Sequence, residues 1–157
     1  AMQPIVLPKL PVAAEVTLMG GEKVSGELFV AAASAHHDGP ETLLELLNDD
    51  GRSFVPFQTH DGIFLLNRST IRTVQFQSPG VMAVFTRADN EDIYAISLVL
   101  RVEEESVTYQ GFCHTGELRP DARRPIDLLN SPGMFVLVYA SNKLLLCNKN
   151  AISHATV

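Results

Sequence analysis

Hydrophobic and polar residues alternate in several short segments of the first half of the chain. Residues 15–18 and 23–30 alternate on either side of a Gly20-Gly21 turn, which is typical of a β-hairpin. Gly26 lies inside the second segment, where a glycine permits a strand to bend. Apolar or alternating segments separated by turn-forming residues follow at 54–57, 63–66 and 71–76. The pattern therefore predicts a small β-rich unit.

Two further segments of this half are harder to assign. The apolar run at residues 43–47 fits either a short helix or a strand, and we favour a strand. Residues 80–92 contain a short apolar run followed by charged, turn-forming residues. We interpret them as a connecting strand and loop between two units.

The second half shows the same kinds of segment in the same order. Residues 94–102 and 107–113 form a second predicted hairpin around the acidic turn at 103–105. Further apolar runs separated by turns lie at 126–130, 134–139 and 144–150, and Ile152 begins a last strand. The acidic turn adds like charges between two strands, which discourages pairing with other sheets.

The two halves share five landmarks in one order, which indicates an internal repeat. The landmark pairs are Gly26 and Gly111, 85 positions apart, Asn48 and Asn130, 82 apart, and Phe54 with Phe135, Asn67 with Asn148 and Ile71 with Ile152, each 81 apart. Surface loops tolerate such small length changes. The sequence thus predicts a first unit at 11–79, a connection at 80–92 and a second unit at 93–157.

A unit of five short strands with a bend glycine in the second is typical of a small SH3-like barrel. Residues 148–153, Asn-Lys-Asn-Ala-Ile-Ser, resemble the corner between the fourth and fifth strands of the bacterial Sm-like protein Hfq. Residues 66–71 resemble the matching corner of Sm and LSm proteins, and residues 24–28 resemble their bent second strand. The resemblance implies an all-β fold: two tandem SH3-like, or Sm-like, five-stranded barrels packed as one body.

Composition limits the class of protein. The 157 residues are 46% hydrophobic, which is enough for a real core, and the net charge of −6 disfavours general coating of nucleic acids. The apolar runs are far shorter than the roughly 20 residues that a membrane helix needs. With no signal-peptide pattern at the start, we expect a cytoplasmic protein. Cys113 and Cys147, in apolar runs without CxxC spacing, are predicted to be buried free thiols.

The sharpest polar feature is a group of three arginines in the loop that precedes residues 126–130. Arg119, Arg123 and Arg124 carry guanidinium groups, which bind phosphate and carboxylate groups in bidentate geometry. The Sm-like resemblance implies that this loop lies on the same rim as Lys149. The candidate ligand-binding residues are Arg119, Arg123, Arg124, Lys149, Asn148, Asn67 and Arg68. The alternative is a solvated surface on which the arginines pair with Glu103, Glu104, Glu105 and Glu117.

Neither half has the Asp and Asn pair between strands two and three, or the Arg-Gly or Lys-His dipeptide at the later corner, that line the RNA site of the Sm-like family. His36 and His37 stand next to Asp38, but no further metal ligand follows at a standard spacing, and a solvated loop is the favoured interpretation. No motif of a nucleophile or of paired carboxylates predicts catalysis, and no cofactor is expected.

These features favour a non-enzymatic binding or assembly protein that associates with itself or with another protein, as the resemblance implies. The alternative hypothesis is RNA or nucleotide binding through the arginine and lysine rim of the second unit, with affinity that falls as salt rises.

Overall fold

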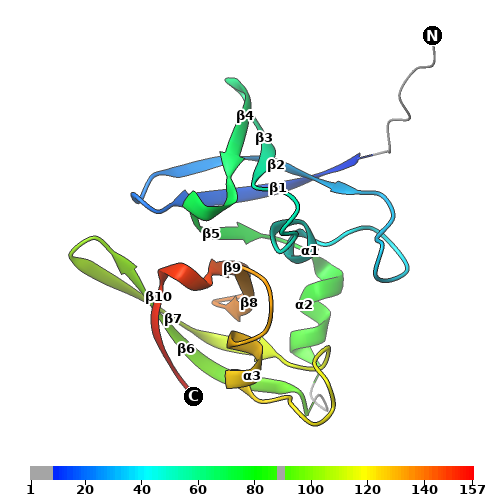
Figure 1. Cartoon of the computed structure of the whole chain (residues 1–157), viewed down its shortest axis with the longest axis vertical. Helices are drawn as coiled ribbons and strands as arrows, with labels where there is room; N and C mark the ends of the chain where they lie inside the picture. Colours follow the sequence, from blue (N-terminus) through cyan, green and yellow to red (C-terminus); the bar gives the residue numbers. More distant parts are fainter. Residues whose placement is uncertain (1–8, 88–90) are drawn as a thin grey trace.

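The strands of the chain form a single antiparallel sheet in a computed structural model, which describes residues 9–87 and 91–157 (Figure 1). The first half contains β1 (Lys9–Leu18), β2 (Lys23–Ala31), α1 (Leu43–Leu47), β3 (Phe54–Thr59), β4 (Gly62–Asn67), the 3-10 turn η1 (Arg68–Thr70) and β5 (Ile71–Phe76). Helix α2 (Pro79–Thr86) follows. The second half contains β6 (Ile93–Val102), β7 (Glu105–His114), α3 (Pro125–Leu129), β8 (Phe135–Ala140), β9 (Lys143–Asn148), η2 (Lys149–Ala151) and β10 (Ile152–Thr156).

The order of strands in the sheet repeats once. It runs β10-β6-β7-β8-β9 and then β5-β1-β2-β3-β4, so each half contributes its strands in the order fifth, first, second, third, fourth. We call β1–β5 with α1 and η1 the first unit, and β6–β10 with α3 and η2 the second unit. The all-β prediction is confirmed. The sheet is open, since β10 and β4 lie at its two ends and do not pair with each other.

Two segments predicted as strands are helices. Residues 43–47 form α1, because the Thr42 side chain accepts a hydrogen bond from the backbone N–H of Glu45 and so caps a first helical turn. The apolar run expected to be a connecting strand is α2, which begins after the cap Ser78 with a proline in its first turn. Residues 88–90 of the predicted connecting loop, and 1–8 of the extended lead-in, lie outside the described part of the chain.

The two bend glycines allow strands to approach closely. A Cβ on Gly26 would overlap the carbonyl oxygen of Gln58, and a Cβ on Gly111 would overlap the carbonyl oxygen of Tyr139. These glycines are equivalent in the two units, and so are the residues they meet, which are 81 positions apart. The glycine predicted to bend the second strand therefore also brings it against the third.

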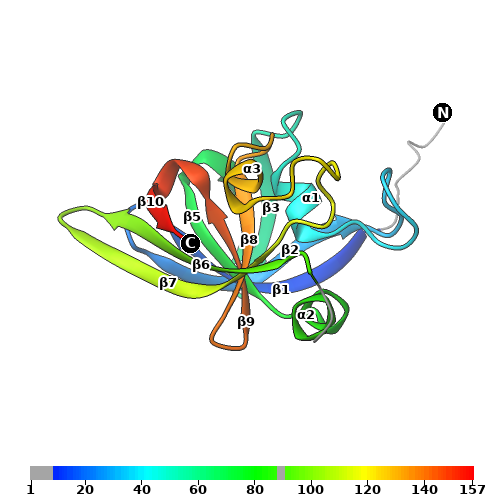
Figure 2. The same ribbon diagram turned by 90° about the horizontal axis from the view of Figure 1, so that it is seen from below.

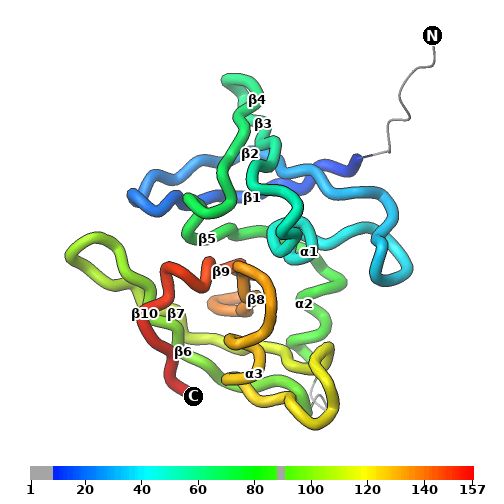
Figure 3. The backbone as a smooth tube through the Cα atoms, in the orientation of Figure 1, coloured from blue at the N-terminus to red at the C-terminus, as the bar shows by residue number. Residues whose placement is uncertain are grey.

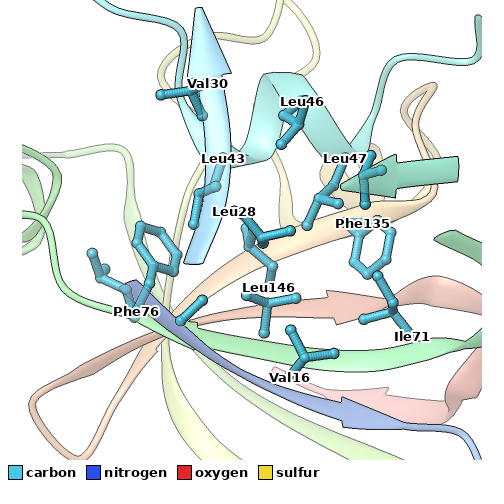
Figure 4. Close-up of a cluster of buried hydrophobic side chains, with 14 of the residues drawn as sticks. Val16, Leu28, Val30, Leu43, Leu46, Leu47, Ile71, Phe76, Phe135 and Leu146 are labelled. Atoms are coloured by element: carbon cyan, nitrogen blue, oxygen red, sulfur yellow. The ribbon is translucent and has the colours of Figure 1, made fainter. Parts of the chain in front are cut away.

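The hydrophobic core of the first unit includes side chains from the second. Val16, Leu28 and the leucines of α1 pack with Phe135 of β8 and with Leu144 and Leu146 of β9 (Figure 4). The other face of β9 belongs to a second core, built on β6, β7, β8 and β9. Because one strand serves both cores, the two units form one body.

The helices lie on two sides of the molecule. Figure 2 shows α1 and α3 together on one side and α2 on the other, while the backbone tube in Figure 3 shows how α2 joins the two units. Phe85 of α2 stacks on Tyr139 of β8, with ring centroids 5.4 Å apart, which fixes this connection against the second unit. Among the described residues, no helix has the length and apolar character needed to cross a membrane.

Candidate interaction surface

The junction between the two units is an antiparallel pairing of β5 with β9. Its register places Thr73 opposite Cys147, Val74 opposite Leu146, Gln75 opposite Leu145 and Phe76 opposite Leu144. The fifth strand of one unit thus pairs with the fourth strand of the other.

Asn48, at the C-cap of α1, closes the same junction beside the strands. Its side-chain oxygen accepts a hydrogen bond of 2.7 Å from the backbone N–H of Phe135, and its amide nitrogen donates one of 3.2 Å to the carbonyl of Phe135. An asparagine side chain presents the same donor and acceptor pair as a peptide group. Asn48 therefore acts as a backbone-like partner that binds the first unit to β8.

Asn148 makes the second polar contact across the junction. Its buried amide nitrogen donates a 2.8 Å hydrogen bond to the carbonyl of Ile71, where β5 begins. Its side-chain oxygen accepts from the backbone N–H of Asn150 and so shapes the corner into η2. A residue proposed as a ligand contact from the sequence thus links the two units.

At one end of the sheet, β4 presents apolar side chains on a strand that pairs on one side only within the described part of the chain. Its described partner is β3, and the hairpin they form projects from the body in Figure 1. Ile63 is 65% exposed and Leu65 is 69% exposed, whereas their equivalents on β9, Leu144 and Leu146, are fully buried. Phe54 on β3 is also exposed. The strand carries no charged residue, although charges and prolines normally protect such edges.

The other end of the sheet is formed by β10, whose described partner is β6. Helix α3 lies in the same unit and has no buried residue, whereas its counterpart α1 buries Leu43, Leu46 and Leu47. Ile126 on α3 is exposed. Helix α1 is covered by β8 and β9 of the other unit, and α3 has no equivalent cover among the described residues.

The three arginines of the predicted anion site each have a carboxylate partner. Arg119 pairs with Asp121 at 2.9 Å, and Arg124 makes a bidentate pair with Asp127 through contacts of 3.0 and 3.2 Å. This pair raises the pKa of Arg124 and lowers that of Asp127, chiefly through the hydrogen bond between the two side chains. The partners of Arg119 and Arg124 are aspartates of the same loop and helix rather than the glutamates expected from the sequence.

Arg123 contacts its own loop and a carboxylate from another segment. Its Nε donates a 2.9 Å hydrogen bond to the carbonyl of Leu118, and its terminal nitrogen lies 3.5 Å from a carboxylate oxygen of Asp92. These contacts tie the loop to the residue that precedes β6. A ligand phosphate would have to compete with this carboxylate, and RNA or nucleotide binding at this rim stays a prediction.

The basic residues at the two corners bind carbonyl groups at the ends of the short helices. Buried Arg68 donates a 2.5 Å hydrogen bond to the carbonyl of Leu47, the last residue of α1. Lys149 donates through Nζ to the carbonyl of Ser131 at 2.6 Å, and partial burial lowers its pKa. Asn67, beside Arg68, accepts a hydrogen bond from the backbone N–H of Ser69. These candidates thus hold the corners together rather than gathering with the three arginines.

A hollow of about 540 Å³ lies beside α1 and the loop before it. Four of its lining residues are acidic: Glu41, Glu45, Asp49 and Asp50. His37 of the loop pairs with Glu45, and a backbone contact with Asp38 together with this pair raises the pKa of His37. The acidic lining disfavours an anionic ligand. Among the described residues no three side chains of the metal-ligating types converge.

Both cysteines are buried and free, as the sequence predicts. Burial raises the pKa of Cys113 to about 11 and that of Cys147 to about 12. A thiol with so high a pKa is almost entirely protonated at neutral pH and is a poor nucleophile. These residues are core side chains.

Comparison of the chain with protein-family models, curated proteins and solved structures finds no match. The resemblance to Sm-like proteins therefore stays a prediction. Sequence reasoning did not find Asn48, Ile63 or Leu65 as interaction residues. A signal was present, because the repeat places Ile63 and Leu65 at the positions of Leu144 and Leu146 in an equally apolar strand.

Proposed function

We propose that the chain is a non-enzymatic binding and assembly module in which two Sm-like units, packed as one body, join it to another protein or to copies of itself. The observation that carries this proposal is the exposure of Ile63 and Leu65 on β4, a strand with one described partner. The outer backbone groups of such a strand can pair with a strand of a partner, and its apolar side chains add contact area. No cofactor is part of the proposal.

Three further features support a protein partner over a small ligand. The exposed apolar residues Phe54, Ile63 and Leu65 lie on one face of one hairpin, so they form an open surface rather than a pocket. Neither β3 nor β4 contains a charged residue that would disfavour burial against another protein. The junction at β5 and β9 demonstrates that strands of this fold pair across unit boundaries, with Leu144 and Leu146 buried in the process.

Photo-crosslinking from β4 tests the proposal. Leu65 is replaced by a benzophenone-bearing phenylalanine analogue, the protein is irradiated in the cells that produce it naturally, and crosslinked polypeptides are identified by mass spectrometry. We expect a discrete crosslinked polypeptide from position 65. The same analogue at Glu104, in the exposed turn between β6 and β7, is the control and should give none. Absence of any crosslinked polypeptide from position 65, in cells that contain the protein, would refute the proposal.

A further inference from the structure

Arg72 of β5 is buried without a partner for its charge. The residue is 6% exposed, and its Nη1 atom makes no hydrogen bond to the described residues. No ion pair among these residues includes it. A buried guanidinium in this state is costly, because its charge has lost water without gaining another contact. The side chain therefore indicates an acceptor group that does not come from the described residues.

A bulge in β5 turns Arg72 away from the first core. The pairing with β1 passes from Ile71 to Thr73 in a single step of β1, so Arg72 is an extra residue without an opposite neighbour. Ile71 packs in the first core, whereas Thr73 lies opposite Cys147, a residue of the second core. Bulges of this kind change the direction of a side chain. Here the bulge places Arg72 beside Thr73, on the side that faces the second unit.

The second unit has the same bulge with a different residue. Between β10 and β6 the extra residue is Ser153, the repeat equivalent of Arg72. Ser153 is exposed, and its hydroxyl contacts the ring of His154. A short, solvated side chain is thus enough for the bulge to form. The bulge itself does not explain a long, buried cation at this position, which points to a ligand.

Polar groups from both units meet near the guanidinium. Tyr109 of β7 is half-buried and packs against the second core. Partial burial is the main cause that raises the pKa of Tyr109, and the nearby thiol of Cys147 adds to it. Arg72 and a hydrogen bond from Thr73 lower this pKa, and the carboxylate of Glu15 raises it. The hydroxyl of Tyr109 is therefore close to a cation, a hydroxyl donor and a carboxylate.

Glu15 reaches this cluster from β1. The register places Glu15 opposite Gln75 and Thr17 opposite Thr73, so all four side chains share the face away from the first core. Glu15 is partly exposed, and it forms no ion pair with Arg72 in the described part of the chain. The cluster thus combines a cation, two hydroxyl groups and an acceptor at the junction of the two units.

We infer that these side chains form a binding site for inorganic phosphate. Arg72 donates charge-assisted hydrogen bonds to phosphate oxygens. Tyr109, which accepts a hydrogen bond from Thr73, donates its own proton to the same oxygens. Glu15 accepts a hydrogen bond from the protonated oxygen of phosphate. The site lies on β1, β5 and β7, away from the β4 end of the sheet.

The carboxylate of Glu15 determines which anion fits. At pH 7 inorganic phosphate keeps a proton that it can donate, whereas sulfate and phosphodiesters have none and are repelled by the carboxylate. A phosphate monoester has mostly lost this proton, because its second pKa is about 6. The site therefore selects free phosphate over the backbone of a nucleic acid and over phosphorylated side chains.

Isothermal titration calorimetry at pH 7 and constant ionic strength is the test. The wild type should bind one phosphate per chain, and sulfate and phenyl phosphate should bind at least about 10-fold more weakly. Arg72→Met keeps a long side chain without its charge and should weaken phosphate binding about 10- to 100-fold. Arg119→Ala is the control and should bind as the wild type does, because Arg119 is exposed and paired with Asp121. Circular dichroism confirms that each variant is folded.

Glu15→Gln tests the selectivity separately. The amide can donate a hydrogen bond where the carboxylate could only accept one. The variant should therefore bind sulfate about as well as phosphate, and it keeps the site testable if Arg72→Met does not fold. A wild type that binds no phosphate at millimolar concentration, or binds sulfate equally well, would overturn the inference. The same holds if folded Arg72→Met binds phosphate as the wild type does, or if Glu15→Gln still rejects sulfate.

Discussion

Replacing Asn48 by alanine should measure the polar contribution of the internal junction. The variant loses two hydrogen bonds to Phe135, of 2.7 and 3.2 Å, while the backbone of Asn48 keeps its own bonds at the end of α1. A hydrogen bond between uncharged groups contributes about 1 kcal/mol net, and leaving a buried partner unpaired costs more. Because Phe135 is almost fully buried, we expect the free energy of unfolding to fall by about 2–3 kcal/mol.

Urea unfolding followed by circular dichroism is the assay. With a dependence on urea of about 2 kcal/mol per molar, the midpoint should fall by roughly 1 M without a change in slope. Asn130→Ala is the matched control, because Asn130 occupies the same place in the second unit without a side-chain hydrogen bond to the described residues. Both substitutions are compared in a Leu65→Glu background, which removes any association of copies through β4. Equal losses for the two variants would refute the role assigned to Asn48.

Three further outcomes are expected. Gly111→Ala should lower the free energy of unfolding by about 1–3 kcal/mol, because its Cβ would overlap the carbonyl of Tyr139. Gly80→Ala in α2, which has open space around it, is the control and should be neutral or stabilising in the same thermal melts. Equal effects of the two substitutions would contradict the close approach of the strands at Gly111. Cys147, with a pKa of about 12, should react with a thiol reagent at pH 8 only as fast as the protein unfolds, so rapid labelling of the folded protein would contradict its burial. The contact between His37 and Glu45 should order the loop before α1 in a limited pH window. The raised pKa of His37 makes its contribution complete below its ordinary value of 6.5 and lost as pH rises through the raised value. For Glu45, partial burial opposes ionisation, but hydrogen bonds from Ser34 and His37 outweigh it and lower the pKa, so its contribution is complete above 4.5 and lost at lower pH. Hydrogen exchange of the loop amides, corrected for the intrinsic effect of pH, should therefore be slowest between pH 4.5 and the raised pKa of His37. The substitution His37→Ala should abolish this minimum in the exchange rate.

Most strands could be predicted from the sequence, because alternating hydrophobic and polar residues mark each strand and turn residues bound it. The equivalence of Asn67 with Asn148 and of Ile71 with Ile152 also predicted the repetition of elements that the fold shows. The errors lie in short segments. Thr42 and Glu45 have the spacing of a helix capping box, and Ser78 with Pro79 is a typical helix start. These local signals specify α1 and α2 better than the hydrophobic period does.

The candidate interaction surface was harder to predict from the sequence. Charge density singled out Arg119, Arg123 and Arg124, but whether a guanidinium is free depends on neighbours such as Asp92, which comes from a segment that precedes β6. The interaction surface depends on which strand ends pair. Nothing in the apolar run of β4 distinguishes it from that of β9 until the sheet order shows that one is internal and the other is at an end.

Helix α2, which links the two units, makes the internal junction respond to dilution differently from a contact between copies. Within the chain, α2 tethers the units, so the contact of β5 with β9 forms at a fixed effective concentration and persists in the most dilute solution. A contact between copies has no such tether and follows mass action. The amount of protein in the cell would then set how many copies associate while leaving each chain folded.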